Sequence, residues 1–411
     1  MKLGALVALL LVVGVGQAGA APAPPSPLAR LVLQRSDLGR AAAGLQIELI
    51  SGEISNARAA DDSFDPADTA TSLAKAGRLT GFRLIYGDPG FEALRRGRGL
   101  IDLGTSLDYF KTPKQASAYE AKSIRDVRRS RGQNLGGVVV GRVSTFRVRG
   151  LGTAAIGVRV VQRIGDKPIY NTYVDFQLGR LICEAAVRRA DSSKAETEAV
   201  AIAQLLADRI LRYSQGTLVA KAVTLPRPLG TSRPRPGAPD LEKMVLKASD
   251  LEPAVVAQQG YAPDDNAMAS YFRRFSLQPR SGLFLLRNAV ALERSEREAA
   301  GRMLILRSTF TGPEAAETLA ALVTPGAKGP KLDGPARSLG IGKESFAVSA
   351  TFTVQSRRLR VVLVHARRDR VVESLIAVGT AKALTNARID GYGRALNRTL
   401  KRAFAKPKLT A

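Results

Sequence analysis

The sequence is poor in the side chains that build metal and redox sites. Of its 411 residues, one is Cys, one is His and none is Trp. A single Cys excludes an intrachain disulfide and any zinc site or cluster held by several thiolates, and a single His excludes a multi-histidine metal site. The sequence therefore predicts no metal site and no cofactor.

Motifs for nucleophilic catalysis and for phosphate binding are missing as well. His365 lies in an apolar, strand-like run, 361–367, and no G-x-S-x-G turn supplies a serine for a triad with it. Residues 340–345 read Gly-Ile-Gly-Lys-Glu-Ser, but a P-loop needs Gly where Arg337 stands and Ser or Thr where Glu344 stands. We predict no catalytic residue and expect His365 to be a sheet residue.

Carboxylates remain as candidate catalysts or ligands. Two acidic groups stand out in the first half of the chain, namely Asp37, Glu48 and Glu53, and the set Asp61, Asp62, Asp65 and Asp68. No regular pattern of apolar residues surrounds the second set, which favours an unstructured acidic loop. A calcium site is the alternative, although the loop pattern D-x-[DN]-x-[DN]-G is absent.

The N-terminus has the form of a secretory signal peptide. Lys2 precedes an apolar run over 3–15, and Ala18-Gly19-Ala20 supplies small residues for cleavage. The run is shorter than the roughly 20 residues that span a bilayer. We predict a signal peptide over 1–20, an uncleaved anchor being the alternative, and no transmembrane span in the mature chain. The expected location is extracellular, periplasmic or associated with the cell wall.

The rest of the chain reads as two copies of one module. Gly152 and Gly342 lie 190 positions apart, and the same offset relates the predicted hairpin turns at 179–180 and 369–370. It also relates two helical apolar faces, Ala199, Ile202, Leu206, Ile210 and Tyr213 in the first copy and Ile389, Tyr392, Leu396, Leu400 and Ala403 in the second. We predict an internal duplication.

The proline pattern divides these copies. Five prolines lie between 226 and 239, and proline disfavours both a helix and a central strand. The segment 214–240 is therefore predicted to be a Pro/Arg-rich linker. The modules then span 28–213 and 241–405. Sequential strands joined by hairpins imply a mainly antiparallel sheet, on which amphipathic helices bury their apolar faces. The predicted fold class is α+β, with two tandem modules of this kind.

Each copy also contains a capped middle helix. In the first copy a strand over 100–110 leads to Thr112-Pro113, which has the form of a helix start. In the second copy we prefer Thr311 as the cap, after a strand over 303–310, to the rival cap at Ser295. On this interpretation 276–300 belongs to an enlarged hairpin.

Short motifs accompany this order of elements in both copies: Ser36-Asp37-Leu38, Phe110 with Thr112-Pro113, and Leu151-Gly152, and then Ser249-Asp250-Leu251, Phe310 with Thr311, and Ile341-Gly342. With them the chain resembles the PsbP-like family of thylakoid-lumen and bacterial envelope proteins, which includes lipoprotein and kinase-sensor modules. The resemblance implies a non-catalytic binding or accessory role outside the cytoplasm and carries over no catalytic residue. The chain departs from those versions because no lipid-anchor Cys follows the signal and no kinase domain is attached.

Positive charge dominates, with a formal net charge of +26, and it gathers near the C-terminus. Residues 357–408 hold fourteen Lys and Arg against three acidic residues. The candidate anion-binding residues are Arg357, Arg358, Arg360, Arg367, Arg368, Arg370, Arg394, Arg398 and Lys401. Such a surface attracts polyanions in a salt-dependent way, although a compositional bias toward Arg explains the same counts.

Three functions follow from these observations. The first is an exported, non-enzymatic binding or accessory protein of the cell envelope. The second is an envelope adhesin or scaffold that binds an anionic cell-wall polymer, an anionic lipid surface or an acidic extracellular protein. Nucleic acid is not an expected partner, because the basic segment lacks interleaved stacking aromatics. The third is a carboxylate-dependent hydrolase. A deep pocket lined by several perturbed carboxylates would count against the first function.

Overall fold

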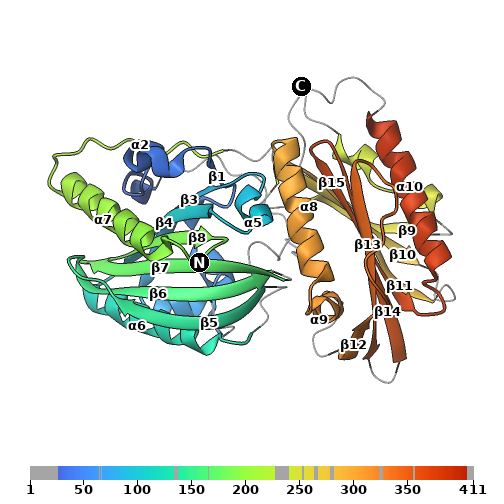
Figure 1. Cartoon of the computed structure of the whole chain (residues 1–411), viewed down its shortest axis with the longest axis horizontal. Coiled ribbons are helices and arrows are strands. Elements are labelled where there is room, and N and C mark those ends of the chain that lie inside the picture. Colours follow the sequence, from blue (N-terminus) through green and yellow to red (C-terminus); the bar gives the residue numbers. More distant parts are fainter. Residues whose placement is uncertain are drawn as a thin grey trace. The chain divides into compact units, whose positions relative to one another are not determined.

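The computed structural model describes residues 26–63, 65, 67–133, 138–164, 166–226, 240–251, 254–262, 267–277, 282–323, 327–354 and 357–404. The chain divides into two compact units, the first ending at Pro226 (Figure 1). The predicted signal peptide over 1–20 lies outside the described residues. Within the described part, no helix has both the length and the apolar character needed to cross a membrane.

The first unit is built on one antiparallel sheet. Its strands run in the order β1-β3-β4-β8-β7-β6-β5, and β2 pairs with β3. Their bounds are β1 Gln46–Ile47, β2 Gly52–Ile54, β3 Arg78–Gly87, β4 Leu100–Phe110, β5 Val138–Arg147, β6 Thr153–Ile164, β7 Lys167–Leu178 and β8 Leu181–Arg189.

Helices cover both faces of this sheet (Figure 1). They are η2 Pro27–Arg30, α2 Arg35–Leu38, η3 Gly39–Ala42, α3 Asn56–Asp61, α4 Ala70–Lys75, α5 Glu92–Arg96, α6 Pro113–Arg129 and α7 Ala195–Ser214. The predicted apolar face of α7 lies on one side, where Ile202, Leu206 and Ile210 are buried in the main core of the unit. Helix α6 lies on the other side and begins as expected, because the Thr112 side chain accepts a hydrogen bond from the Gln115 amide at 3.2 Å.

The second unit repeats this plan. Its antiparallel sheet runs β12-β13-β14-β15-β11-β10-β9. The strands are β9 Ala254–Ala262, β10 Ala269–Leu277, β11 Leu283–Leu292, β12 Lys328–Leu332, β13 Glu344–Val354, β14 Arg357–Arg368 and β15 Val371–Thr380. The helices are η4 Leu241–Met244, η5 Ala248–Asp250, α8 Glu296–Thr311, α9 Ala315–Ala321 and α10 Asn386–Phe404. Figure 1 shows this sheet between α8 and α10.

The predicted α+β class and the repeated sheet module are confirmed. In both units a turn glycine with positive φ sits against a strand carbonyl, and a Cβ there would lie 2.3 Å from that oxygen. The glycines are Gly152 and Gly342, the oxygens belong to Gln177 and Arg367, and both pairs are related by the offset of 190. Glycine is therefore required at the same point of each copy.

The prediction for the middle helix of the second copy is wrong. Residues 303–310 are not a strand but the second half of α8, and the cap is Ser295, whose side chain accepts a hydrogen bond from the Glu298 amide at 3.2 Å. The supposed enlarged hairpin, 276–300, contains the end of β10, the whole of β11 and the start of α8. Strand β11 is thus the counterpart of β4, because each leads directly to the capped helix.

Part of the predicted linker is described. Ser214 is the last residue of α7, and the segment 217–226 then packs against the first unit. There the Val223 amide donates to the Ala29 carbonyl at 3.2 Å. Residues 227–239, with most of the linker prolines, lie outside the described residues.

Candidate functional site

A row of polar side chains crosses the sheet of the first unit. Strand register aligns Arg83 of β3, Ser106 of β4, Glu184 of β8 and Asp175 of β7. Side chains alternate between the two faces of a sheet, so their neighbours, such as Cys183, point into the core under α7. Asp175 and Glu184 face each other directly across two antiparallel strands, which brings their Cβ atoms to about 5 Å.

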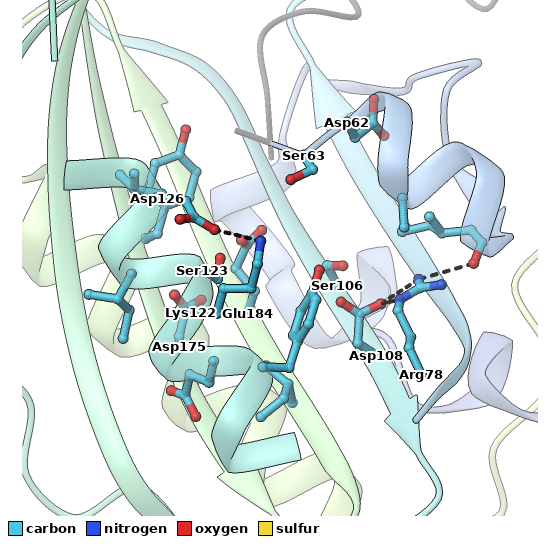
Figure 2. Close-up of a pocket in the computed structure, with 18 of the residues that line it drawn as sticks. Asp62, Ser63, Arg78, Ser106, Asp108, Lys122, Ser123, Asp126, Asp175 and Glu184 are labelled. Carbon is cyan, nitrogen blue, oxygen red and sulfur yellow. Dashed lines mark hydrogen bonds and ion pairs between the residues drawn. The ribbon is translucent and has the colours of Figure 1, made fainter. Parts of the chain in front are cut away.

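Helix α6 lies over this row, and a partly open cavity of about 130 Å³ lies between the two (Figure 2). Tyr119, Glu120, Ser123 and Val127 line it from the helix, where spacings of three and four residues place them on one face. The remaining wall comes from the sheet and from residues between 54 and 68. The cavity therefore has a helix on one side and the polar row on the other.

Carboxylates dominate the described lining. Seven acidic residues face three basic ones, and the acidic residues are Asp62, Asp68, Asp108, Glu120, Asp126, Asp175 and Glu184. Four of these are bound by the basic residues: Arg78 pairs with Asp108 at 2.6 Å, Arg83 with Asp62 at 2.6 Å, and Lys122 with both Asp68 and Asp126. Negative charge consequently exceeds positive charge in this cavity, although the whole chain is strongly basic.

Three carboxyl groups, Glu120, Asp175 and Glu184, stand outside these ion pairs, and we call them the inner carboxyls. Glu120 is 5% exposed, and its Oε1 has no hydrogen-bond partner among the described residues. Burial raises the pKa of Glu120 to about 7. Burial, and then the charges of Glu184 and Glu120, raises the pKa of Asp175 well above its usual range. The inner carboxyls therefore favour a proton or another cation beside them.

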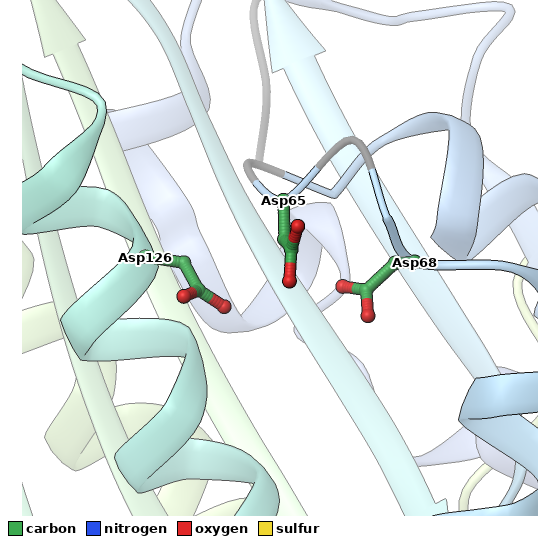
Figure 3. A group of neighbouring side chains, drawn as sticks. All are labelled: Asp65, Asp68 and Asp126. Carbon is green, nitrogen blue, oxygen red and sulfur yellow. The ribbon is translucent and has the colours of Figure 1, made fainter.

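A second acidic group lies at the edge of the cavity (Figure 3). The ammonium group of Lys122 lies 3.0 Å from Asp65, 3.1 Å from Asp68 and 2.8 Å from Asp126. We call these three aspartates and Lys122 the rim cluster. The aspartate oxygens lie within 4.8 Å of one another, so the donor set itself suits a hard divalent cation. In this structure the lysine ammonium already occupies the position between them.

The acidic stretch in the sequence is therefore not a solvated loop. Asp61 ends α3, Asp62 is bound by Arg83, and Asp65 and Asp68 are bound by Lys122. A hydrogen bond from the Ala67 amide, and then the one from Lys122, lowers the pKa of Asp65. Ion pairs to the sheet and to α6 thus hold the described residues of this stretch in place.

The basic residues predicted to bind anions are spread over the second unit. Arg357 and Arg358 are exposed at the start of β14, whereas Arg367, Arg368 and Arg370 lie at its far end, roughly 30 Å away for nine strand residues. Two of the nine have acidic partners: Arg360 contacts Asp333 at 2.7 Å and Arg367 contacts Glu344 at 3.5 Å. Arg368 stacks over Phe404. Arg394, Arg398 and Lys401 are exposed on α10.

The second unit has an apolar core where the first has its cavity. The offset of 190 places His365 and Ser374 at the positions of Asp175 and Glu184, and they pair in the same way, with His365 Nδ1 2.7 Å from Ser374 Oγ. Phe310 and Phe346 flank the histidine ring. Burial, and then the charge of Arg302, lowers the pKa of His365 to about 3, so the ring is neutral. His365 is a sheet residue, as expected.

Sequence reasoning missed the inner carboxyls. Glu184 interrupts an otherwise apolar run in its strand, and Asp175 stands between a valine and a phenylalanine in the strand that pairs with it. Both lie on the face covered by the helix that begins after Thr112. An acidic residue on the covered face of a strand is the signal that could have found them. Glu120 gave a weaker signal, because a charge within a helix pattern is ordinary.

Comparisons with known proteins add little to this geometry. A scan against protein-family models gave no match, PsbP-like models included, and a search of the curated proteins gave none either. Among solved structures, the extracellular domain of PknH from Mycobacterium tuberculosis is 15% identical, covers 47% of this chain and 100% of its own, and has a TM-score of 0.31. The immunity protein TplEi of a Pseudomonas aeruginosa T6SS is 10% identical over 75% of this chain and 91% of its own, with a TM-score of 0.19. The Tle4-Tli4 complex is 12% identical over 74% and 86%, with a TM-score of 0.17. TM-scores this low support no argument about fold or function.

Proposed function

We propose that the protein is an exported accessory protein whose first unit binds a ligand bearing positive charge. The observation that carries this proposal is the surplus of carboxylates in the cavity under α6, seven against three basic residues, in a chain with a net charge of +26. Buried charges are normally paired, because removing an ion from water costs several kcal/mol. A bound cation would offset this surplus of negative charge.

The duplicated module supports this assignment. In the second unit the positions of Asp175 and Glu184 hold a neutral, hydrogen-bonded His365 and Ser374 within an apolar core. The fold is therefore compatible with neutral side chains at these two positions. It does not require carboxylates at Asp175 and Glu184, and a role in ligand binding would explain why they are there.

The test is cation binding to the full chain. Isothermal titration would compare organic ammonium, guanidinium and divalent metal cations on the wild type and on Asp175→Asn with Glu120→Gln. A matched control is Asp208→Asn, because Asp208 is exposed on α7, on the opposite face of the sheet. Binding that the double variant loses and the control keeps supports the proposal. Binding of no cation by the wild type, or equal binding by the double variant, would refute it.

Export is part of the proposal. It rests on the signal-peptide pattern over 1–20, and the mature chain would be extracellular, periplasmic or bound to the cell wall. The module limits 28–213 and 241–405 and the PsbP-like resemblance belong to the same proposal. Edman sequencing of the mature protein from its native host would test the signal, since cleavage after Ala20 predicts Ala21-Pro22 as the first residues.

An anionic surface remains a second proposed partner, for the second unit. Arg394, Arg398 and Lys401 are exposed and follow the i, i+4, i+7 spacing of one face of α10. Charge reversal at these three positions should abolish salt-sensitive binding to anionic vesicles or wall polymers. Unchanged binding by that variant would eliminate the adhesin function. The control is charge reversal at Arg212, exposed on α7.

A carboxylate-dependent hydrolase is also a candidate, because the cavity combines a carboxyl of raised pKa, Glu120, with neighbouring carboxylates. In such an enzyme the protonated carboxyl is the general acid. Hydrolysis of esters, glycosides or peptides that Glu120→Gln abolishes would favour catalysis over binding. If the wild type hydrolyses none of these substrates, the hydrolase function is refuted.

A further inference from the structure

We propose that the cation bound between α6 and the sheet is a primary ammonium group carried on a slender aliphatic chain. This inference rests on the proposed function and names its ligand class. It is drawn from the placement of the inner carboxyls, the size and lining of the cavity, and the way in which the chain binds its own lysine at the rim.

The inner carboxyls come from three different elements. Glu120 projects from α6, Asp175 from β7 and Glu184 from β8, so they approach the cavity from the helix and from the sheet. An ammonium group has three donors that point in different directions. A guanidinium is planar and prefers two parallel bonds to one carboxylate. Acceptors on opposite walls therefore suit the ammonium better.

A single metal ion fits the inner carboxyls poorly. In the described part of the chain, the acidic group whose oxygens lie mutually within 4.8 Å is the rim cluster, Asp65, Asp68 and Asp126. Glu120, Asp175 and Glu184 do not form such a set, whereas Ca²⁺ needs its oxygen ligands at 2.3–2.6 Å. An ammonium group can bind to one or two of these carboxyls, because it does not need the full shell of oxygen ligands that Ca²⁺ requires.

In the rim cluster, carboxylates of this chain already bind a primary ammonium group, that of Lys122. The Lys122 ammonium contacts three aspartates from two segments at 2.8–3.1 Å. Lys122 lies two residues from Glu120, so α6 carries both the ammonium of the rim cluster and one of the inner carboxyls. The cavity wall can thus hold a primary ammonium with carboxylates alone.

The remaining lining suits methylene groups. Tyr119, Tyr173, Val127, Val158 and Ile182 contribute apolar surface to the cavity. Its volume of about 130 Å³ is well below the 300–1,000 Å³ typical of sites for drug-sized ligands. A cavity of this size suits a narrow alkyl chain better than a bulky organic cation. Tyrosine rings also attract ammonium groups at their faces.

The experiment is isothermal titration of the full chain at pH 8 with pentylamine, pentylguanidine, tetraethylammonium and CaCl₂. Pentylamine should bind most tightly, and Asp175→Asn and Glu120→Gln should each weaken it at least about tenfold, since each loses a charged acceptor. Asp208→Asn should bind like the wild type. Both amides are nearly isosteric with the acids, and circular dichroism checks their folding.

Pentylguanidine or CaCl₂ bound at this site as tightly as pentylamine would overturn the ammonium inference and leave the proposed function standing. Absence of any bound cation would overturn both. Nα-acetyl-lysine amide distinguishes the sources of the amine. Binding equal to that of pentylamine supports a lysine side chain as the ligand, and weaker binding supports a free aliphatic amine.

Discussion

Replacing Glu120 by Gln tests the electrostatics of the cavity independently of any ligand. Burial raises the pKa of Glu120 from 4.5 to about 7 in the folded chain. A carboxyl whose folded pKa lies above its unfolded pKa binds protons more tightly when folded, so the free energy of unfolding falls as the pH rises from about 4.5 to 7. A difference of about 2.5 between the two pKa values corresponds to roughly 3 kcal/mol.

Gln keeps the shape of the side chain and removes its titration. We therefore expect Glu120→Gln to match the wild type at pH 4 and to exceed its stability by up to roughly 3 kcal/mol at pH 8, where the wild-type carboxyl is ionised. Urea denaturation of the full chain at both pH values, followed by circular dichroism, measures the difference. The exposed control Asp208→Asn should change stability by less than about 0.5 kcal/mol at either pH. A variant less stable than the wild type at pH 8, or a difference independent of pH, would refute the reasoning.

Three further substitutions test the fold and the rim cluster. Ser295→Ala removes the acceptor of the Glu298 amide and should lower the free energy of unfolding by about 1 kcal/mol in urea, whereas no change would contradict the cap assignment. Gly342→Ala places a Cβ 2.3 Å from the Arg367 carbonyl oxygen at positive φ and should cost more than about 1 kcal/mol; a neutral result would mean that this turn can relax. Lys122→Met leaves three aspartates without their ammonium, so Ca²⁺ should raise the melting temperature of this variant and not that of the wild type. An equal response of both proteins would show that the rim cluster is not the cause.

Most of the fold could be predicted because its signals are local. The hairpin at 179–180, the cap at Thr112 and the apolar face of α7 each depend on a few neighbouring residues. Helix α8 was the exception. It buries Met303, Ile305, Leu306 and Phe310, which lie on more than one face of the helix, so its apolar residues do not follow a single stripe and the run resembles a strand.

The site was less accessible to sequence reasoning. The pairing of Asp175 with Glu184 follows from the hairpin, because both lie the same number of residues from the turn at 179–180. The position of Glu120 near this pair does not follow from the hairpin, because it depends on how α6 packs on the sheet. The raised pKa of Glu120 is a consequence of that tertiary burial and has no local signature in the sequence.

The two copies show which parts of the module serve the fold. Each keeps a turn glycine, here Gly152 and Gly342, against a strand carbonyl, because the backbone path allows no Cβ there. Each also keeps a polar pair at the centre of the covered face, but the second copy makes it neutral and surrounds it with aromatic rings. Stability alone favours the neutral version, since burying carboxylates beside one another raises their free energy. The first copy instead places Asp175 and Glu184 side by side at a cavity, and a cationic ligand bound there would lower the free energy of this arrangement.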